Sequence, residues 1–257
     1  MFSLVAFLES VDAANAYNAL AAIADQHIRV SGDDLYVPKL NQIIVLAAGV
    51  GSGGLGHVRL AAPSLRGLTR PILEPVNGRN DGNVEPDSPH KVHDYRRVPI
   101  PLLENEVLNA EVHSDTTAAA VQWLLAWLAD GPVEPVAGKS FTVRATGTTT
   151  LVANAWTNVP LVFDEDLPRG RYQVIGMRAR STGCIAGRLV FIGGIHRPGV
   201  LGTDAQEDLE WPGFRQGGLG VFGEFDDLNP PSVDFLSLSA DTAETVILDL
   251  VQVAAGG

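Results

Sequence analysis

The chain has 257 residues, of which 46% are hydrophobic, enough to bury a core in one large or two ordinary domains. Thirty acidic against 18 basic residues give a formal charge of −12, which excludes attraction of the whole surface to nucleic acid or to an anionic membrane. The single cysteine, Cys184, excludes an intramolecular disulfide framework and a cysteine-based zinc cluster, and its apolar neighbours predict a small buried side chain.

The N-terminal part predicts one helix. Residues 1–8 are apolar but too short to span a bilayer, and they lack the basic region of a signal peptide. Ser10 suits an N-cap, and small or apolar residues then recur at helical spacing: Val11, Ala14, Tyr17, Ala21 and Ala24. We therefore predict a helix over residues 11–26. No later stretch is apolar for the length of a membrane span, so we expect a soluble chain.

From Asp33 onward, short β-rich runs are separated by Gly, Pro, Asn and Asp, as is typical of an all-β chain. The predicted strands cover residues 42–50, 57–62, 106–112, 119–128, 141–145, 149–155, 172–180, 187–192, 220–225, 233–238 and 245–253. Residues 116–130 mix helix-favouring residues with a period-two alternation through Trp123 and Trp127. We predict a strand there, with both tryptophans in the core, because the counterpart at 244–253 is rich in residues that favour strands.

That counterpart belongs to an internal repeat. Residues 37–60 lie over 167–190 without a gap, which places Val37-Pro38-Lys39 on Leu167-Pro168-Arg169. Asp115-Thr116 similarly matches Asp241-Thr242, 126 positions further on. Because the two pairs occur in the same order, the sequence predicts a module of roughly 125 residues used twice.

The repeat also sets the domain boundaries that we expect. Residues 1–32 form an N-terminal arm with the helix, residues 33–134 a first β module and residues 135–257 a second one, joined by a stiff linker near residues 131–135. Each module carries an irregular excursion in the same relative place, at 68–101 and at 193–232. Long ordered loops on small β domains commonly serve recognition or assembly.

The motifs that suggest chemistry are weak. Residues 51–56 match the G-x-G-x-x-G dinucleotide pattern, but a strand follows where a helix is needed, so they indicate a tight connection between strands. His90, His93 and Asp94 have metal-ligating side chains but lie in a proline-rich loop without a rigid frame. Five arginines lie close in sequence and are interpreted as solvated strand faces: Arg169, Arg171, Arg178, Arg180 and Arg188.

Acidic groups in predicted loops could accept calcium, although none has EF-hand spacing: Asp164-Glu165-Asp166, Asp204 with Glu207 and Asp208, and Asp226-Asp227. We interpret them as solvated loops, with calcium between subunits as the alternative. The sequence shows no nucleophile elbow, and Cys184 is not expected to be a nucleophile. No catalytic or cofactor-binding residue is predicted, no metal ligand is assigned, and we expect no enzyme.

Two tandem β modules of this size, with long loops at equivalent points and an N-terminal helix, have the proportions of paired jelly rolls. With the repeated segments at Pro38 and Pro168 and at Asp115 and Asp241, the chain resembles the double jelly-roll major capsid proteins of tailless icosahedral viruses of bacteria or archaea. The resemblance is architectural and covers almost the whole chain.

The resemblance implies an all-β fold of two tandem jelly rolls and a homotrimer whose six barrels form a pseudo-hexagonal tile of an icosahedral shell. It implies a virion protein made in the host cytoplasm, with itself and penton or minor capsid proteins as partners, without sequence-specific nucleic-acid contact. A membrane beneath the shell and calcium at subunit contacts are both compatible with it. We expect the two excursions to form tower or subunit contacts, and Phe2, Phe7 and the helix to face the base of the shell.

Two alternatives stay open. A carbohydrate- or receptor-binding β-sandwich, such as a viral spike or a lectin, would need exposed aromatic platforms, for which Trp156 and Trp211 are the candidates. A polysaccharide lyase on a β scaffold is the third reading, because jelly rolls host all three roles.

Overall fold

A computed structural model describes residues 1–10, 13, 15–24, 28–37, 39–50, 55–65, 72–77, 91–114, 121–134, 136, 139–204 and 211–255. These residues form strands and two short 3-10 helices, η1 (Pro63–Leu65) and η2 (Pro212–Phe214), so the predicted all-β class is confirmed. They divide into two compact units. The first unit comprises residues 5–131, and the second comprises residues 132–257 together with residues 1–4.

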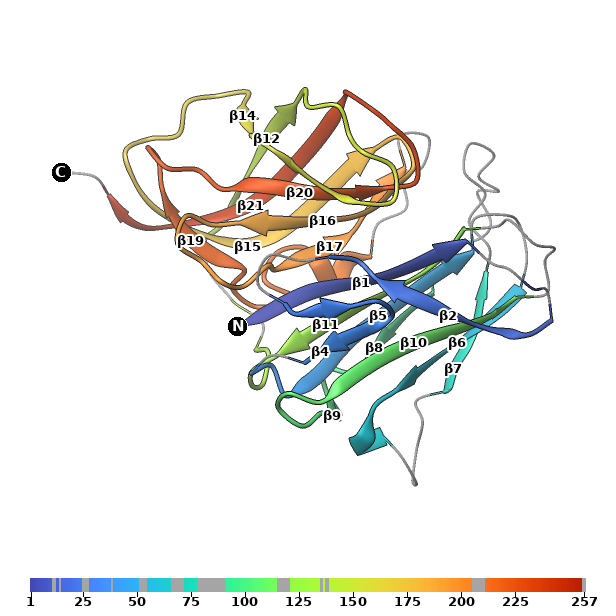
Figure 1. Ribbon diagram of the computed structural model, residues 1–257. Coiled ribbons are helices and arrows are strands. Elements are labelled where there is room, and N and C mark those ends of the chain that lie inside the picture. The colour runs from blue at the N-terminus through green and yellow to red at the C-terminus, as the bar shows by residue number, and fades with distance from the viewer. Residues whose placement is uncertain are drawn as a thin grey trace. The chain divides into compact units, whose positions relative to one another are not determined.

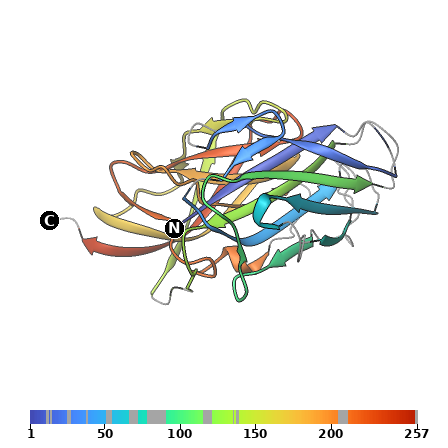
Figure 2. The ribbon, with the colours of Figure 1, turned by 60° about the horizontal axis from the view of Figure 1, so that its bottom comes forward.

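Two antiparallel rows of strands build the first unit (Figure 1). Its strands are β1 (Phe2–Ser10), β2 (Tyr17–Ala22), β3 (Val30–Ser31), β4 (Asp34–Tyr36), β5 (Gln42–Val50), β6 (Leu55–Ala61), β7 (Ile72–Asn77), β8 (Lys91–Asp94), β9 (Ile100–Pro101), β10 (Val107–Ser114) and β11 (Val121–Ala129). One row has the order β1-β11-β5-β8, and the other has the order β2-β10-β6-β7. In both ribbon views β10 (green) runs along β2 (blue), its partner in the second row (Figure 2).

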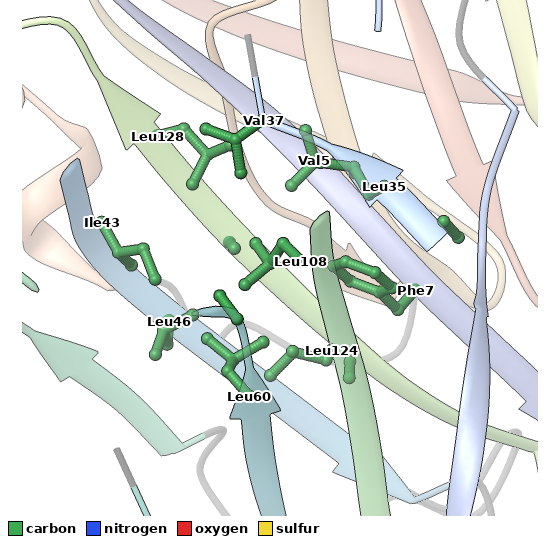
Figure 3. Close-up of a cluster of buried hydrophobic side chains, with 14 of the residues drawn as sticks. Val5, Phe7, Leu35, Val37, Ile43, Leu46, Leu60, Leu108, Leu124 and Leu128 are labelled. Atoms are coloured by element: carbon green, nitrogen blue, oxygen red, sulfur yellow. The ribbon is translucent and has the colours of Figure 1, made fainter. Parts of the chain in front are cut away.

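Alternating side chains of both rows fill the core of the first unit (Figure 3). Phe7 of β1, Leu124 of β11 and Leu46 of β5 come from one row, and Leu60 of β6 and Leu108 of β10 come from the other. All five are fully buried. Because side chains alternate across a strand, the residues between them point to the opposite faces of the rows.

The second unit repeats this pairing. Its strands are β12 (Phe141–Gly147), β13 (Trp156–Val159), β14 (Val162–Phe163), β15 (Gly170–Ser181), β16 (Cys184–Val190), β17 (Gly199–Leu201), β18 (Thr203–Asp204), β19 (Gly223–Asp226), β20 (Ser232–Ser237) and β21 (Glu244–Ala255). One sheet has the order β12-β21-β15, with β19 paired to the free side of β15, and the other has the order β13-β20-β16-β17. Each strand of the first order therefore has a counterpart at the same place in the second.

Several predicted elements are confirmed. Residues 42–50 and 233–238 match β5 and β20 closely, and the ambiguous stretch 116–130 contains strand β11, whose residues Trp123 and Trp127 are fully buried. Cys184 is also fully buried, as predicted. Residues 149–155 are not a strand, although Ala153 forms an isolated bridge with Ser237.

The predicted helix at residues 11–26 is wrong. Residues 17–22 form strand β2, which pairs with β10 and with β1, and no α-helix occurs among the described residues. The alanine-rich spacing that suggested a helical stripe is compatible with a strand, because Leu20 and Ala22 face the core while Tyr17 and Ala19 point outward. Pairing with two neighbours overrides the weak helix propensity of these residues. Phe2 and Phe7, expected at the base of a shell, are buried.

The described parts of the two excursions contain short strands that the sequence did not predict. The described part of 68–101 contains β7, β8 and β9, and that of 193–232 contains β17, β18, η2 and β19. These strands pair with central strands of their own unit, so they are parts of the sandwich. Within the described residues, no helix is long and apolar enough to cross a membrane.

Candidate functional site

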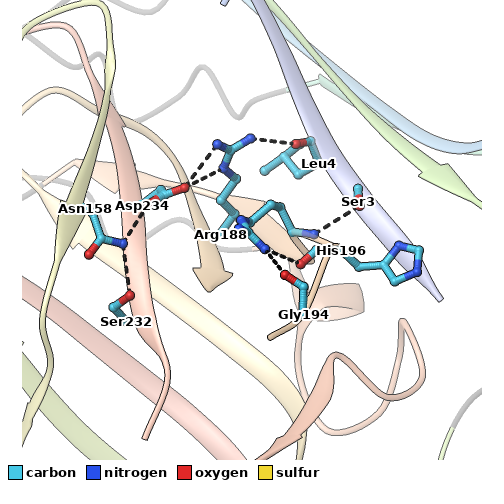
Figure 4. A network of polar contacts seen from close by, with 9 residues as sticks. Ser3, Leu4, Asn158, Arg188, Gly194, His196, Ser232 and Asp234 are labelled. Carbon is cyan, nitrogen blue, oxygen red and sulfur yellow. Dashed lines mark hydrogen bonds and ion pairs between the residues drawn. The ribbon is translucent and has the colours of Figure 1, made fainter. Parts of the chain in front are cut away.

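A buried polar constellation lies on the outer face of the β13-β20-β16 sheet of the second unit (Figure 4). Arg188 of β16 stands opposite Asp234 of β20, and its Nε and Nη2 both lie 3.0 Å from the Asp234 carboxylate. The same guanidinium lies 4.0 Å above the ring of Trp156, at the start of β13. Asn158 donates to the second carboxylate oxygen at 2.8 Å. Arginine, carboxylate and aromatic ring thus form one network on three adjacent strands. The interpretation of Arg188 as part of a solvated strand face is therefore wrong.

The first residues of the chain cover this network. Arg188 Nη1 approaches the carbonyl oxygen of Leu4 at 3.5 Å, and Leu4 N–H donates to the carbonyl of Arg197 at 2.8 Å. Ser3 Oγ accepts from Arg197 N–H at 3.0 Å, and the ring of Phe2 meets that of Phe222 edge-on with centroids 5.0 Å apart. An extended backbone therefore supplies a carbonyl to a buried arginine, which a charged group in a low-dielectric site requires.

The first unit carries the same constellation at the same registers. Arg59 of β6 stands opposite Glu111 of β10 and forms an ion pair with it through Nε. Its guanidinium lies 3.7 Å above the ring of Tyr17, at the start of β2. The spacing along the strand is also the same. Ala19 stands opposite Glu111, two residues after Tyr17, and Asn158 stands opposite Asp234, two residues after Trp156. Here the arginine and glutamate side chains remain 26% and 32% exposed.

Two histidines extend the constellation of the first unit. His113 of β10 lies between Tyr17 and His57 of β6 in register, with ring centroids 5.3 Å and 6.0 Å from theirs in edge-on contacts. We call Tyr17, His57, Arg59, Glu111 and His113 together the Arg59 surface. It combines aromatic edges with an arginine whose side chain is 26% exposed, and aromatic residues and arginine are enriched at protein interfaces.

A second buried ion pair fixes a loop of the second unit to its sheet. The Asp249 carboxylate of β21 accepts hydrogen bonds from Arg215 Nε at 2.7 Å and Nη2 at 2.8 Å, from Gln216 N–H at 2.9 Å and from Thr142 Oγ1 at 2.9 Å. Burial raises the pKa of this carboxyl, but the hydrogen bonds outweigh it and hold the pKa below its ordinary value. Asp249 is therefore an ionised structural group.

Glu244 is also a buried carboxyl, but unlike Asp249 it lacks hydrogen-bond donors within the described part of the chain, and its pKa is raised. It faces the interior at the start of β21, is 1% exposed, and neither of its oxygens has a hydrogen-bond partner among the described residues. Burial first, and the charge of Asp241 second, raise its pKa. Ser181, next in register on β15, is equally buried. Glu244 is thus poised to hold a proton inside the sandwich.

A pocket of about 360 Å³ lies on the outer face of the other sheet of the second unit. It is lined by Arg144, Arg178 and Arg180 together with Ala243, Thr245 and Ile247 of the neighbouring segment. Cross-strand register places Arg144, Ile247 and Arg178 in one row. Arg144 forms an exposed ion pair with Asp164 at 2.8 Å, so part of this positive charge is already balanced.

The candidate metal ligands do not gather into a site. His90 lies outside the described residues, whereas His93 stacks on Tyr95 and Asp94 binds Arg96 at 2.6 and 2.9 Å. The Arg96 hydrogen bond lowers the pKa of Asp94. Over the described part of the chain, no three His, Cys, Asp or Glu side chains meet where they could share a metal ion.

The remaining candidates are structural or lie outside the described ranges. Residues 51–54 and 205–210, with Glu207 and Asp208, are outside them, and a strand follows the glycine-rich segment as predicted. Asp227 accepts a hydrogen bond from Gly170 N–H at 2.8 Å. Trp156 is covered by Arg188, and Trp211 packs edge-on against Phe214 at 4.7 Å, so neither ring offers the open platform expected of a sugar site.

Sequence reasoning missed both constellations. A signal was present, because Arg59 and Arg188 lie 129 positions apart, one short of the offset of the first repeated segment.

Comparisons with known proteins return little. No protein-family model matches the chain, and no curated protein matches it. Among solved structures, the chain is weakly similar to the major capsid protein P2 from bacteriophage PM2. The two share 10% sequence identity over 100% of this chain and 98% of that chain, with a TM-score of 0.26.

Proposed function

We propose that this chain consists of two tandem jelly rolls and is a structural protein of a virus particle, a major capsid protein whose homotrimers tile an icosahedral shell. The observation that carries the proposal is the repeated strand order of the two units. A jelly roll is a sandwich of eight strands in two sheets with Greek-key connections.

Both units fit that connectivity. If the eight main strands of a unit are counted along the chain, the first, eighth, third and sixth lie side by side, and so do the second, seventh, fourth and fifth. In the first unit these strands are β1, β2, β5, β6, β7, β8, β10 and β11, and in the second they are β12, β13, β15, β16, β17, β19, β20 and β21. The matching constellations of Arg59 and Arg188 support a duplication of one ancestral sandwich.

Duplication supports assembly for a geometric reason. Three copies of a duplicated module present six nearly equivalent edges, so a trimer can pack in a lattice of near-hexagonal tiles, and symmetry multiplies modest contacts. A formal charge of −12 favours solubility of the unassembled protein and leaves enclosure of a genome free of sequence-specific contacts. Penton or minor capsid proteins are the further partners of the proposed shell, which is compatible with a membrane beneath it.

Native mass spectrometry with negative-stain imaging tests the proposal. The purified protein is measured at low and near-molar salt, with and without calcium. We expect trimers with a six-lobed outline, or closed shells. A chain that stays monomeric under all four conditions would refute the assembly function, and a glycan array would then test the lectin-like alternative.

A further inference from the structure

One cross-strand row of inward-facing residues in the second unit is polar. Register across β12, β21 and β15 gives two apolar rows: Val143, Leu248 and Met177, and then Ala145, Val246 and Ala179. At the end of the same sheet the row consists of Gly147, Glu244 and Ser181. Glu244 and Ser181 are each 1% exposed, and among the described residues neither the carboxyl oxygens nor the hydroxyl has a hydrogen-bond partner. This part of the core therefore ends in polar groups that the sandwich leaves unsatisfied.

The carboxyl of Glu244 fits closely against its surroundings. A Cβ on Gly147 would lie 3.0 Å from Oε2 of Glu244 and 2.1 Å from Cγ1 of Val159, which is fully buried. An ionised carboxylate in such an apolar site is strongly unfavourable, so the group either keeps a proton or must reach water. Burial, with the charge of Asp241, outweighs the nearby backbone N–H groups of Glu244 and Thr149 and raises the pKa of Glu244.

Asp241 is the charged group that acts on Glu244, and it is held in the ionised form. Burial raises the pKa of Asp241, but hydrogen bonds from the N–H groups of Thr182 and Thr242, both at 2.7 Å, outweigh burial and lower it. The residues that face Glu244 from the surrounding strands do not titrate: Gly147, Val159 and Ser181. The arginines of the same sheet line its outer face: Arg144, Arg178 and Arg180. A second negative charge on Glu244 would therefore meet one already present.

The chain segment that closes this end of the sandwich is attached to Asp241. Residues 148–155, which we call the closing segment, connect β12 to β13. Within it, Leu151 N–H donates to the backbone carbonyl of Asp241 at 2.9 Å, and Asn154 N–H donates to that of Ser237 at 2.8 Å. The side chain of Leu151 is buried. These contacts keep the closing segment packed over the end of the sheet where Glu244 lies.

We propose that this end of the second unit is a proton-dependent switch, in which the closing segment stays packed while Glu244 carries a proton and opens when that proton is lost. The opened end gives the carboxylate access to water. The switch lies within one unit, so the inference goes beyond the proposed function and does not depend on assembly.

The direction of the switch follows from linkage. In the open form Glu244 has an ordinary pKa of about 4.3, whereas the closed form holds the proton to higher pH. Opening therefore becomes more favourable as pH rises between these two values and levels off above them. Asp241 acts in the other direction, because its lowered pKa favours the closed form above its open-form value of about 3.9. Measurements from roughly pH 5 upward therefore isolate Glu244.

Hydrogen–deuterium exchange with mass spectrometry measures the opening. The protein is labelled between roughly pH 5 and pH 9, and the rates are corrected for intrinsic exchange. In the wild type we expect the ratio of open to closed form at residues 148–155 to rise up to about tenfold per pH unit until the folded pKa is passed, while strand β20 keeps its protection. Glu244→Gln should abolish the rise, because the amide cannot ionise.

Two further variants control the measurement. Glu106→Gln is the matched control, because Glu106 is a buried carboxyl of the first unit that has donors: Ser64 N–H at 2.9 Å, Ser64 Oγ at 2.6 Å and Leu103 N–H at 2.7 Å. It should keep the wild-type pH dependence of the closing segment. Asp241→Asn removes the neighbouring charge but keeps an acceptor oxygen, so it should give a smaller rise.

The wild type alone can overturn the inference. Exchange at residues 148–155 that is independent of pH after correction does so, and so does a rise that Glu244→Gln retains. If Glu244→Gln fails to fold, carbon-13 NMR of the wild-type carboxyl groups decides. A Glu244 signal that titrates at its ordinary value of about 4.3 overturns the switch, and one that titrates at higher pH together with the opening supports it.

Discussion

Replacing Asp249 with alanine removes the acceptor of four hydrogen bonds inside the second unit. The carboxylate is 1% exposed and receives Arg215 at 2.7 and 2.8 Å, with Gln216 N–H and Thr142 Oγ1 each at 2.9 Å. Removal of one partner from a buried ion pair costs about 3–5 kcal/mol. Because Arg215 is 20% exposed and can rehydrate, we expect the lower end, about 3 kcal/mol, which lowers Tm by roughly 10 °C for a domain of this size.

Differential scanning calorimetry and urea unfolding of the wild type, Asp249→Ala and Asp164→Ala provide the measurement. Asp164 is the control, because it also pairs with an arginine, Arg144 at 2.8 Å, but at 39% exposure. Exposed pairs contribute about 0–1 kcal/mol, so Asp164→Ala should leave Tm nearly unchanged. If the two variants lose equal stability, the buried network does not stabilise the loop as argued.

The contribution of Asp249 to stability should depend on pH in a defined direction. Burial raises the pKa of Asp249, yet its hydrogen bonds outweigh burial and lower the pKa. A carboxyl with a lowered folded pKa contributes stability above its unfolded pKa of about 3.9 and loses it as pH falls through the folded value. The stability gap between wild type and Asp249→Ala should therefore be full at neutral pH and shrink in acid. A gap that stays constant into strong acid contradicts the assignment.

Three further changes have defined outcomes. Burial and the charge of Asp241 raise the pKa of Glu244, so wild-type stability falls as pH rises from the unfolded pKa of about 4.3 through the folded value. Urea titrations at several pH values should show that Glu244→Gln loses this dependence and is more stable than the wild type at neutral pH. Gly49→Ala places a Cβ 2.4 Å from the Trp123 ring across the β5–β11 pair and should cost about 1–3 kcal/mol in urea unfolding, with a changed Trp fluorescence spectrum. Deletion of residues 1–4 uncovers the network of the second unit and should lower its Tm by several degrees in calorimetry, whereas an unchanged Tm shows that the cover adds no stability.

The sequence predicted the all-β class and the central strands, because apolar alternation and the repeat agreed there. At residues 116–130 local propensity favoured a helix, and the counterpart at 244–253 decided correctly for strand β11. The same comparison does not reach the N-terminal part, because Tyr17 and Trp156 lie 139 positions apart and neither repeat offset aligns them. The predicted helix at 11–26 was wrong because it rested on local alanine spacing. The structure of residues 17–22 is instead determined by their pairing with β10, which is distant in sequence.

The short strands within the excursions were missed for a related reason. Short edge strands such as β8 and β17 have too few residues to show periodicity, and glycines and prolines around them resemble loop composition. Their pairing with β5 and β16 is a long-range property. Likewise, Arg188 lies among residues read as solvated, and nothing near it in sequence indicates that Leu4 covers it.

The repeated arginine constellation occurs in two settings that differ in exposure. A buried ion pair contributes little net stability, because desolvation of both charges offsets their attraction, so a covered pair needs further hydrogen bonds to its remaining donors. Arg188 meets that requirement within the chain through Leu4, and there the pair is dry. Arg59 and Glu111 form the same pair with their side chains 26% and 32% exposed, so less desolvation opposes their attraction. The same strand register therefore holds an ion pair in both units, and the covered pair is the one that needs a backbone carbonyl from outside its own sheet.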